Sequence, residues 1–268
     1  MPLADLGDIR LFYKDQGDGP PVVGIMGFML DHRFWAAQAS TITRHHRFIT
    51  FDNRGIGRSS RHVASSSEEM ADDTIRLMDH LGVEKAIVFG VSMGGTIAQR
   101  LVVAHPDRVS GLILAATCAR PNEFMLRRHA LARLLAEQWG PQRLFEASLL
   151  FFFTPRFFEA GREVIDRIYD SVDPEGAALP AETVLGQLDV VEKHDALADL
   201  PHITCPTLVM GAKMDFMVPY FASEEIAAAI PGAELVTFES GHAFMIEEME
   251  PFNRRVAQFL ETLRQPVT

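Results

Sequence analysis

Short apolar runs alternate with amphipathic stretches through the first 115 residues of the chain. Apolar, β-branched-rich runs occupy residues 9–13, 22–26, 48–51, 86–89 and 112–115, a length and composition typical of buried strands. Between the third and fourth runs, mostly apolar residues recur at positions 70, 74, 77, 78 and 81, which is the spacing of one helical face. Ser66 with Glu69 predicts the start of this helix and Gly82 its end. Strands alternating with helices predict a parallel sheet covered by helices.

The pattern changes between about residues 120 and 198. Strand-like runs disappear, leucines at helical spacing lie among arginines, and phenylalanines cluster at 151–153 and 157–158. The alternation then returns, with strands expected at 207–210 and 235–238 and helices near 224–230 and 251–263. We therefore predict an α/β core formed by residues 1–119 and 199–268. A helical cap, residues 120–198, interrupts it.

Composition and charge narrow the class of protein. Of 268 residues, 47% are hydrophobic and 23% charged, an ordinary globular composition. The formal charge of -11 repels phosphates, so we expect neither nucleic acid nor a membrane as a partner. No apolar run reaches the roughly 18 residues of a membrane span, and the N-terminus lacks a secretory signal pattern, so a cytoplasmic protein is expected. Two cysteines, Cys118 and Cys205, are too few for a disulfide framework or a zinc site and are expected to be buried free thiols.

The segment Gly90-Val91-Ser92-Met93-Gly94 carries the strongest chemical signal. It matches G-x-S-x-G and lies between a predicted strand and a predicted helix, the context of a nucleophile elbow. Such a turn holds the serine in a strained backbone conformation, and side chains at positions 90 and 94 would crowd it. The alternative is a Gly/Ser-rich turn that merely ends a strand.

A serine hydroxyl needs a base, and the base needs an acid to orient it. Among ten histidines, His242 directly follows the strand predicted at 235–238, where strand ends present side chains to a ligand. Asp215 comes just after the strand predicted at 207–210. A loop aspartate commonly forms a turn, but the chain order Ser…Asp…His favours Asp215 as the acid. Glu123 is its nearest rival.

Two backbone amides are candidates for an oxyanion hole. The Met93 amide would lie at the N-terminus of the helix after Ser92, where the helix dipole favours negative charge. The Phe28 amide would come from the loop after the strand at 22–26. The Gly24–Gly27 loop could suggest phosphate binding, but neither of the phosphate-binding glycine motifs occurs in the chain, which argues against it.

Four segments together resemble the α/β-hydrolase superfamily over essentially the whole chain. They are Phe51-Asp52-Asn53-Arg54-Gly55-Ile56-Gly57-Arg58-Ser59-Ser60, residues 90–95, Cys205-Pro206-Thr207-Leu208-Val209 and Ser240-Gly241-His242. The resemblance implies an α/β-hydrolase fold with an eight-stranded, mostly parallel sheet flanked by helices. It also implies a helical cap after the sixth strand and a Ser92–Asp215–His242 triad.

Within the superfamily, the motifs are similar to those of enol-lactonases and small esterases. Many members carry His-Gly in the oxyanion loop, whereas this chain has Met26-Gly27, which some methylesterase-like members resemble. The leading hypothesis is hydrolysis of a small, largely apolar ester or (enol-)lactone through an acyl-enzyme, with no metal or cofactor. Carbon–carbon bond hydrolysis, perhydrolase chemistry and hydroxynitrile cleavage are alternatives on such scaffolds, and a non-catalytic ligand-binding module is a further one.

Substrate-contacting candidates are Met26, Gly27, Phe151, Phe152 and Met217. Packing of the cap is the preferred interpretation for the phenylalanine cluster as a whole. The arginines at 127, 128 and 133 could bind a substrate carboxylate, but a solvated helix face is the preferred interpretation. The natural substrate and the oligomeric state are left open.

Overall fold

The computed structural model describes residues 2–171 and 179–264, and within them eight strands form one sheet in the order β1-β2-β4-β3-β5-β6-β7-β8. The strands are β1 (Leu3–Asp5), β2 (Arg10–Gln16), β3 (Pro21–Ile25), β4 (Arg47–Phe51), β5 (Ala86–Val91), β6 (Val109–Ala115), β7 (Thr207–Ala212) and β8 (Glu234–Phe238). Only β2 pairs antiparallel, with β1 and β4; all other pairs are parallel. The predicted eight-stranded, mostly parallel sheet is confirmed. The pattern missed β1, which is too short for periodicity.

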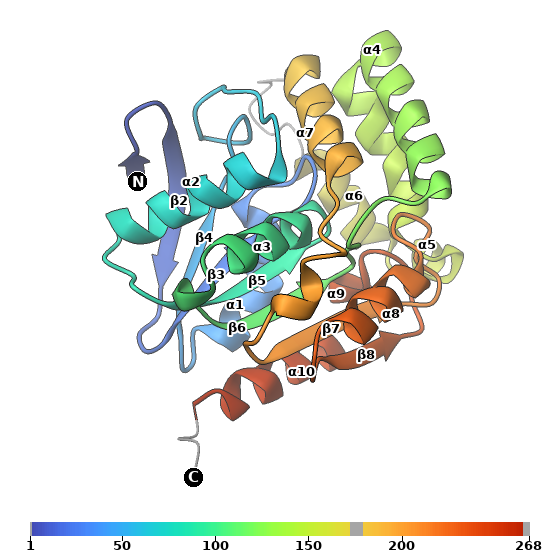
Figure 1. Ribbon diagram of the computed structural model, residues 1–268. Coiled ribbons are helices and arrows are strands. Elements are labelled where there is room, and N and C mark those ends of the chain that lie inside the picture. Colours follow the sequence, from blue (N-terminus) through green and yellow to red (C-terminus); the bar gives the residue numbers. More distant parts are fainter. Residues whose placement is uncertain (1, 172–178, 265–268) are drawn as a thin grey trace.

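Helices cover both faces of the sheet, as Figure 1 shows. On β5, Val88 packs with α2 (Ser67–His80), α3 (Met93–Ala104) and α8 (Tyr220–Ala229). Its neighbours Ile87 and Phe89 point to the opposite face, which α1 (Ala36–Ile42) and α10 (Met249–Thr262) cover. A strand buried on both faces must be apolar at successive positions, which explains the continuous run that marked it in the sequence.

The predicted boundaries of α2 are confirmed at both ends. The Ser66 hydroxyl accepts a hydrogen bond from the Glu69 amide at 3.1 Å, the contact expected of an N-cap. Gly82 follows the helix with a φ of 65°, a left-handed conformation that glycine adopts without steric cost.

Among the described residues, four α-helices lie between β6 and β7, where the cap was predicted, in the upper right of Figure 1. They are α4 (Glu123–Phe152), α5 (Pro155–Ala160), α6 (Arg162–Ser171) and α7 (Ala181–Lys193). A non-helical Gly140 followed by Pro141 breaks α4 into two parts. The cap core includes Phe145 and Leu188, and it also takes in Met29 and Ala243 from loops of the sheet domain. The helices between β6 and β7, where a cap was predicted, therefore pack directly on those loops.

The exact division at residues 119/120 and 198/199 stays a prediction, and residues 1, 172–178 and 265–268 of the predicted ranges lie outside the described part. The remaining short elements are 3-10 turns at His32–Trp35, Pro106–Arg108 and Leu200–His202, and helix α9 (Phe244–Glu247).

Neither cysteine forms a disulfide; Cys118 is buried, whereas Cys205 is half-buried rather than buried as expected. Among the described helices, none has the length and apolar character needed to cross a membrane.

Candidate active site

Ser92 occupies the turn between β5 and α3 with a φ of 56° and a ψ of -121°, outside the regions that side-chain-bearing residues favour. A Cβ built on Gly90 would lie 2.4 Å from the Gly94 carbonyl oxygen. A Cβ on Gly94 would lie 2.0 Å from the carbonyl oxygen of Ile25 in β3. Both glycines of the motif are therefore required by contact with backbone atoms, as expected for an elbow.

The three residues predicted to form a triad lie in one hydrogen-bonded line. His242 Nε2 is 3.1 Å from Ser92 Oγ, and His242 Nδ1 is 2.8 Å from Asp215 Oδ2. The other carboxylate oxygen of Asp215 accepts hydrogen bonds from the Met217 and Val218 amides, each at 2.7 Å. These two amides fix the carboxylate in its turn, so that one oxygen remains directed at the imidazole. The residues follow β5, β7 and β8, whose carboxyl ends lie along one edge of the sheet.

The rival acid, Glu123, lies elsewhere. It stands in the first turn of α4 with a side chain that is 73% exposed, and it forms an ion pair with Arg127 at 2.7 Å. The carboxylate that contacts His242 is that of Asp215, so the geometry favours the chain-order prediction.

The two candidate oxyanion residues lie near Ser92: Met93 follows it directly, and Phe28 lines both pockets that Ser92 lines. Met93 is the first residue of α3, so its amide has no intrahelical acceptor and lies at the positive end of the helix dipole. Phe28 lies on the loop after β3. That loop is held at both ends: Asn53 Nδ2 donates to the Met26 carbonyl at 2.9 Å, and Gln187 Oε1 accepts from the Met29 amide at 2.8 Å.

Asn53 and Gln187 are site residues that the sequence analysis missed. Each is buried and comes from a segment remote in sequence from the loop it steadies: Asn53 from the loop after β4, and Gln187 from helix α7. Asn53 is part of the segment on which the superfamily resemblance rests, but nothing local to Gln187 marks it. Because Met26 offers no polar side chain, these two amides supply the side-chain hydrogen bonds that hold the loop.

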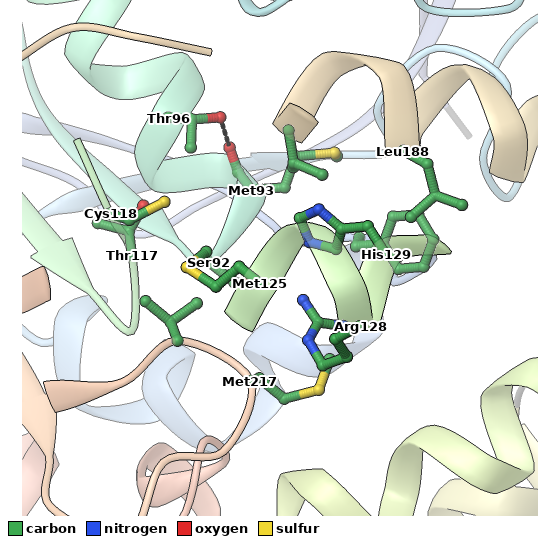
Figure 2. Close-up of a pocket in the computed structure, with 13 residues that line it drawn as sticks. Ser92, Met93, Thr96, Thr117, Cys118, Met125, Arg128, His129, Leu188 and Met217 are labelled. Atoms are coloured by element: carbon green, nitrogen blue, oxygen red, sulfur yellow. Dashed lines mark hydrogen bonds between the residues drawn. The ribbon is translucent and has the colours of Figure 1, made fainter. Parts of the chain in front are cut away.

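Two pockets meet at Ser92, and Phe28, Ser92 and Met217 line both of them. The first pocket (Figure 2) has about 470 Å³ of empty space and is further lined by Met93, Thr96, Thr117, Cys118, Met125, Arg128, His129, Leu188, Val191 and Val218. The second has about 590 Å³ and is further lined by Met26, Gly27, Leu30, Phe34, Val91, Phe152, Phe153, Ile168, His242, Ala243, Met245 and Ile246. The second is almost entirely apolar, whereas the first holds the titratable side chains of Arg128, His129 and Cys118.

Four of the five candidate substrate residues line these pockets, namely Met26, Gly27, Phe152 and Met217. The Phe152 ring lies 5.5 Å from the His242 ring, centroid to centroid. Phe151 differs, because it is 36% exposed and lines neither pocket. At the end of α4, Leu150 and Phe151 both face the surface, whereas the following residues Phe152 and Phe153 line the second pocket.

The arginines of α4 separate into two kinds. Arg127 pairs with Glu123, and Arg133 pairs with Asp189 and Glu192 of α7, as expected of a solvated face. For Arg128 that interpretation is wrong, because its side chain lines the first pocket (Figure 2). Helical periodicity of charges could not separate the three, since the cap's packing against the sheet domain decides which face turns inward.

The two other titratable side chains of the first pocket are uncharged near neutral pH. Burial raises the pKa of the Cys118 thiol to about 12. Burial, with smaller contributions from Arg128 and Arg133, lowers the pKa of His129 to about 3. The thiol is therefore neither a thiolate nucleophile nor a charged partner for Arg128.

Among the described residues, one group of side chains has ligand atoms close enough together for a metal ion. Asp31, His32 and Asp52 are buried, with one such atom of each within 4.8 Å of the others. Their atoms already have partners: Asp31 binds Arg33, and Asp52 accepts from the His32 ring at 2.5 Å and from the Arg58 amide at 2.9 Å. These contacts join the loops after β3 and β4, so the group has a structural explanation without an ion.

The sequence model of the α/β hydrolase fold family matches residues 20–249. A protein of Azorhizobium caulinodans that bears the name carbamate hydrolase RutD is 31% identical, over 99% of this chain and 100% of that protein. The enol-lactonase of Burkholderia xenovorans has a similar structure, with a TM-score of 0.90 and 27% identity over 97% of this chain and 100% of that chain. A malate-bound thermophilic esterase of Thermogutta terrifontis gives a TM-score of 0.86 and 30% identity, over 96% and 95% of the two chains. The chain therefore belongs to the α/β hydrolase fold family and is a hydrolase.

Proposed function

We propose that the protein hydrolyses carboxylic esters or lactones through an acyl-enzyme formed on Ser92. The observation that carries the proposal is the hydrogen-bonded line from Ser92 through His242 to Asp215, with Ser92 on a strained glycine-flanked turn. In this proposal Ser92 is the nucleophile, His242 the general base and acid, and Asp215 the residue that orients the imidazole.

The acylation step follows from the atoms in contact. With Nδ1–H donated to Asp215, the neutral His242 ring offers the Nε2 lone pair to the Ser92 hydroxyl. Ser92 Oγ attacks the carbonyl carbon as its proton moves to Nε2, and the Phe28 and Met93 amides donate hydrogen bonds to the oxyanion. Collapse of the tetrahedral intermediate breaks the ester C–O bond, and Nε2 gives its proton to the departing alcohol.

Water then completes the cycle. It attacks the acyl carbon and loses one proton to His242 Nε2, and the second tetrahedral intermediate expels Ser92 Oγ, which takes that proton back. The carboxylic acid leaves, and in a lactone the released hydroxyl remains on the same product molecule.

The apolar second pocket supports a substrate with a hydrocarbon portion. Its lining from Met26, Phe34, Phe152 and Ile246 offers no charged side chain to a ligand, and burial of alkyl or aryl surface there favours binding. The names of the similar enol-lactonase and thermophilic esterase agree with an ester or lactone bond as the target.

Carbamate hydrolysis is a second candidate, and the name of the Azorhizobium caulinodans protein supports it. The same line of three residues would attack a carbamate carbonyl in the same way. The carbamate carbonyl is less electrophilic because the nitrogen lone pair is delocalised into it. A carbamate matched to an ester in shape therefore distinguishes the two: faster turnover of the carbamate would replace the ester proposal.

The test compares p-nitrophenyl butyrate hydrolysis by the wild-type protein and by the Ser92→Ala variant. We expect turnover by the wild type and a loss of about 10⁶ in kcat in the variant. Ser110→Ala, at an exposed position on β6, is the matched control and should retain wild-type rates. Retention of more than about a hundredth of kcat by Ser92→Ala would contradict the nucleophile assignment. If the folded wild type hydrolyses no ester, lactone or carbamate, assays with a vinylogous diketone and with peroxide would test the carbon–carbon and perhydrolase alternatives.

A further inference from the structure

A partly buried arginine, which has no partner among the described residues, lines the pocket beside Ser92. Arg128 extends from α4 into the first pocket, and Figure 2 shows its guanidinium inside the ring of lining side chains, above Met217 in the view. Its Nε is buried and has no hydrogen-bond partner. Across residues 2–171 and 179–264, no carboxylate forms an ion pair with it.

The other arginines of α4 differ from Arg128, because each of them pairs with a carboxylate. Arg127 is 80% exposed and still pairs with Glu123, while Arg143 pairs with Glu146 and Arg133 binds two carboxylates of α7. Water could solvate the exposed and half-exposed arginines of α4, and yet each of them has an acidic partner. Arg128, whose buried Nε is shielded from water and most needs a partner, has none among the described residues.

The residues around Arg128 do not neutralise its charge. His129 and Cys118 are uncharged near neutral pH, for the reasons given above. Asp215 acts on Arg128 only through its electric field, since its oxygens already accept from His242, Met217 and Val218. Burial lowers the pKa of Arg128 to about 10, which still leaves the guanidinium protonated at neutral pH.

The pocket therefore presents one positive charge, partly shielded from water, among apolar side chains such as Met125, Leu188, Val191 and Val218. An unpaired charge in such surroundings is costly, and an anionic ligand group that pairs with it removes that cost. A planar carboxylate matches the guanidinium fork and carries the single negative charge that one arginine balances. A phosphate dianion would leave a second charge without a partner among these apolar residues.

We propose that Arg128 binds a free carboxylate of the substrate, so that the protein acts on esters or lactones that carry a second, ionised carboxyl group. This inference rests on the proposed function, because it takes the bond broken at Ser92 as an ester or lactone. The carboxylate occupies the first pocket, and the hydrocarbon remainder of the substrate extends into the second pocket across Ser92.

Matched pairs of substrates test the inference. Mono-p-nitrophenyl glutarate against p-nitrophenyl pentanoate places the charge on the acyl side, and 4-acetoxybenzoate against its methyl ester places it on the alcohol side. For the wild type we expect a higher kcat/KM for the anionic member of at least one pair. The quantity measured is the anion-to-neutral ratio of kcat/KM, because a folding defect lowers both rates and leaves the ratio unchanged.

Substitutions at two adjacent arginines then identify the source of the preference. Arg128→Met should lower the ratio by about 10- to 100-fold, the size of a lost hydrogen bond to a charged group. Arg128→Glu should disfavour the anion further, and Arg128→Lys should retain part of the preference. Arg127→Met, on the exposed side of the helix, should leave the ratio at its wild-type value. An unchanged ratio in Arg128→Met, or no preference for either anion in the wild type, would overturn the inference.

A binding measurement separates this inference from the proposed function. Calorimetry on Ser92→Ala with each intact anionic ester and with glutarate reports carboxylate binding without turnover. Binding of any of these that weakens by about 10-fold or more when Arg128→Met is added supports the carboxylate subsite, even if the wild type proves unable to hydrolyse esters. Ester hydrolysis by the wild type without Arg128-dependent binding supports the proposed function and overturns the inference.

Discussion

The carboxylate of Glu247 joins the cap to the loop that carries His242 by binding Thr154 twice. Glu247 Oε1 accepts from the Thr154 amide at 2.8 Å and Oε2 from the Thr154 hydroxyl at 2.7 Å, while the Gly241 amide donates to Oε1 at 3.3 Å. The Ala243 amide also donates to the Phe152 carbonyl at 2.8 Å. The residues on either side of His242 are thus fixed to the end of α4, which supplies Phe152 to the second pocket.

We expect Glu247→Leu to lower kcat by roughly 10- to 100-fold, because small displacements of a catalytic group have large effects on rate. The substitution removes the acceptor of three hydrogen bonds and frees the Gly241–His242 segment from the cap. Thr154→Val removes only the hydroxyl contact and should have a smaller effect.

The matched control is Glu250→Leu, at an exposed position near the start of α10. Steady-state kinetics with p-nitrophenyl butyrate, together with a thermal unfolding curve for each variant, provides the comparison. Equal kcat values in Glu247→Leu and Glu250→Leu would show that the contact to the cap does not position His242.

Asp215→Ala should lower kcat by about 10⁴. The variant loses the acceptor that holds His242 Nδ1–H and stabilises the imidazolium during attack. Glu123→Gln is the control, since Glu123 is exposed and paired with Arg127. The assay is ester hydrolysis with burst-phase analysis. Similar kcat values for Asp215→Ala and the wild type would mean that another group orients His242.

Gly94→Ala should destabilise the fold at the elbow itself. The added Cβ would lie 2.0 Å from the Ile25 carbonyl oxygen and 3.0 Å from that of Met26, and both belong to the backbone. We expect the free energy of unfolding to fall by about 3 kcal/mol or more, as for overpacked cores. At Gly82 an added Cβ would meet open space, but the φ of 65° is unfavourable for alanine. Gly82→Ala should therefore lower the free energy of unfolding by only about 1 kcal/mol. Urea unfolding measures both, and equal losses would refute the steric explanation.

Stability should decrease in mild acid because two histidines are buried in the neutral form. Burial lowers the pKa of His129 to about 3 and that of His194 to about 4, with nearby arginines adding to both shifts. Below the ordinary histidine pKa of about 6.5, the unfolded chain binds protons that the folded chain does not, so unfolding becomes more favourable as the pH falls. Between about pH 7.5 and about pH 5, each of the two histidines should therefore lower the free energy of unfolding by about 2 kcal/mol.

Urea unfolding at the two pH values measures this effect. Over the same pH interval, the free energy of unfolding of His129→Leu should fall by about 2 kcal/mol less than that of the wild type. The variant has no side chain at position 129 that binds a proton on unfolding. His45→Leu, at an exposed position just before β4, is the control and should match the wild type. A His129→Leu variant with the wild-type pH dependence would mean that His129 is protonated in the folded protein.

The sequence predicted the features that depend on neighbouring residues. The apolar run 86–89 identified β5, because a strand buried on both faces needs apolar side chains at successive positions. The Gly90–Gly94 motif identified the turn at Ser92, since the steric demand of that turn acts on residues within it. The roles predicted for Ser92, Asp215 and His242 stay proposals, but the chain order that suggested them agrees with the hydrogen bonds between their side chains.

The cap and the loops around Ser92 depended on tertiary structure. Arg127, Arg128 and Arg133 lie close together in the sequence, and only the packing of α4 turns Arg128 into the pocket and Arg133 towards Asp189 of α7, while Arg127 pairs within its own helix. Gln187 holds the Met29 amide across 158 positions of the chain, a contact that no local pattern encodes. Side-chain periodicity specifies which residues share a face of an element. The partners of that face depend on how distant elements pack, so the sequence by itself determined the sheet and its serine turn, and the folded structure decided the charge and shape of the pocket.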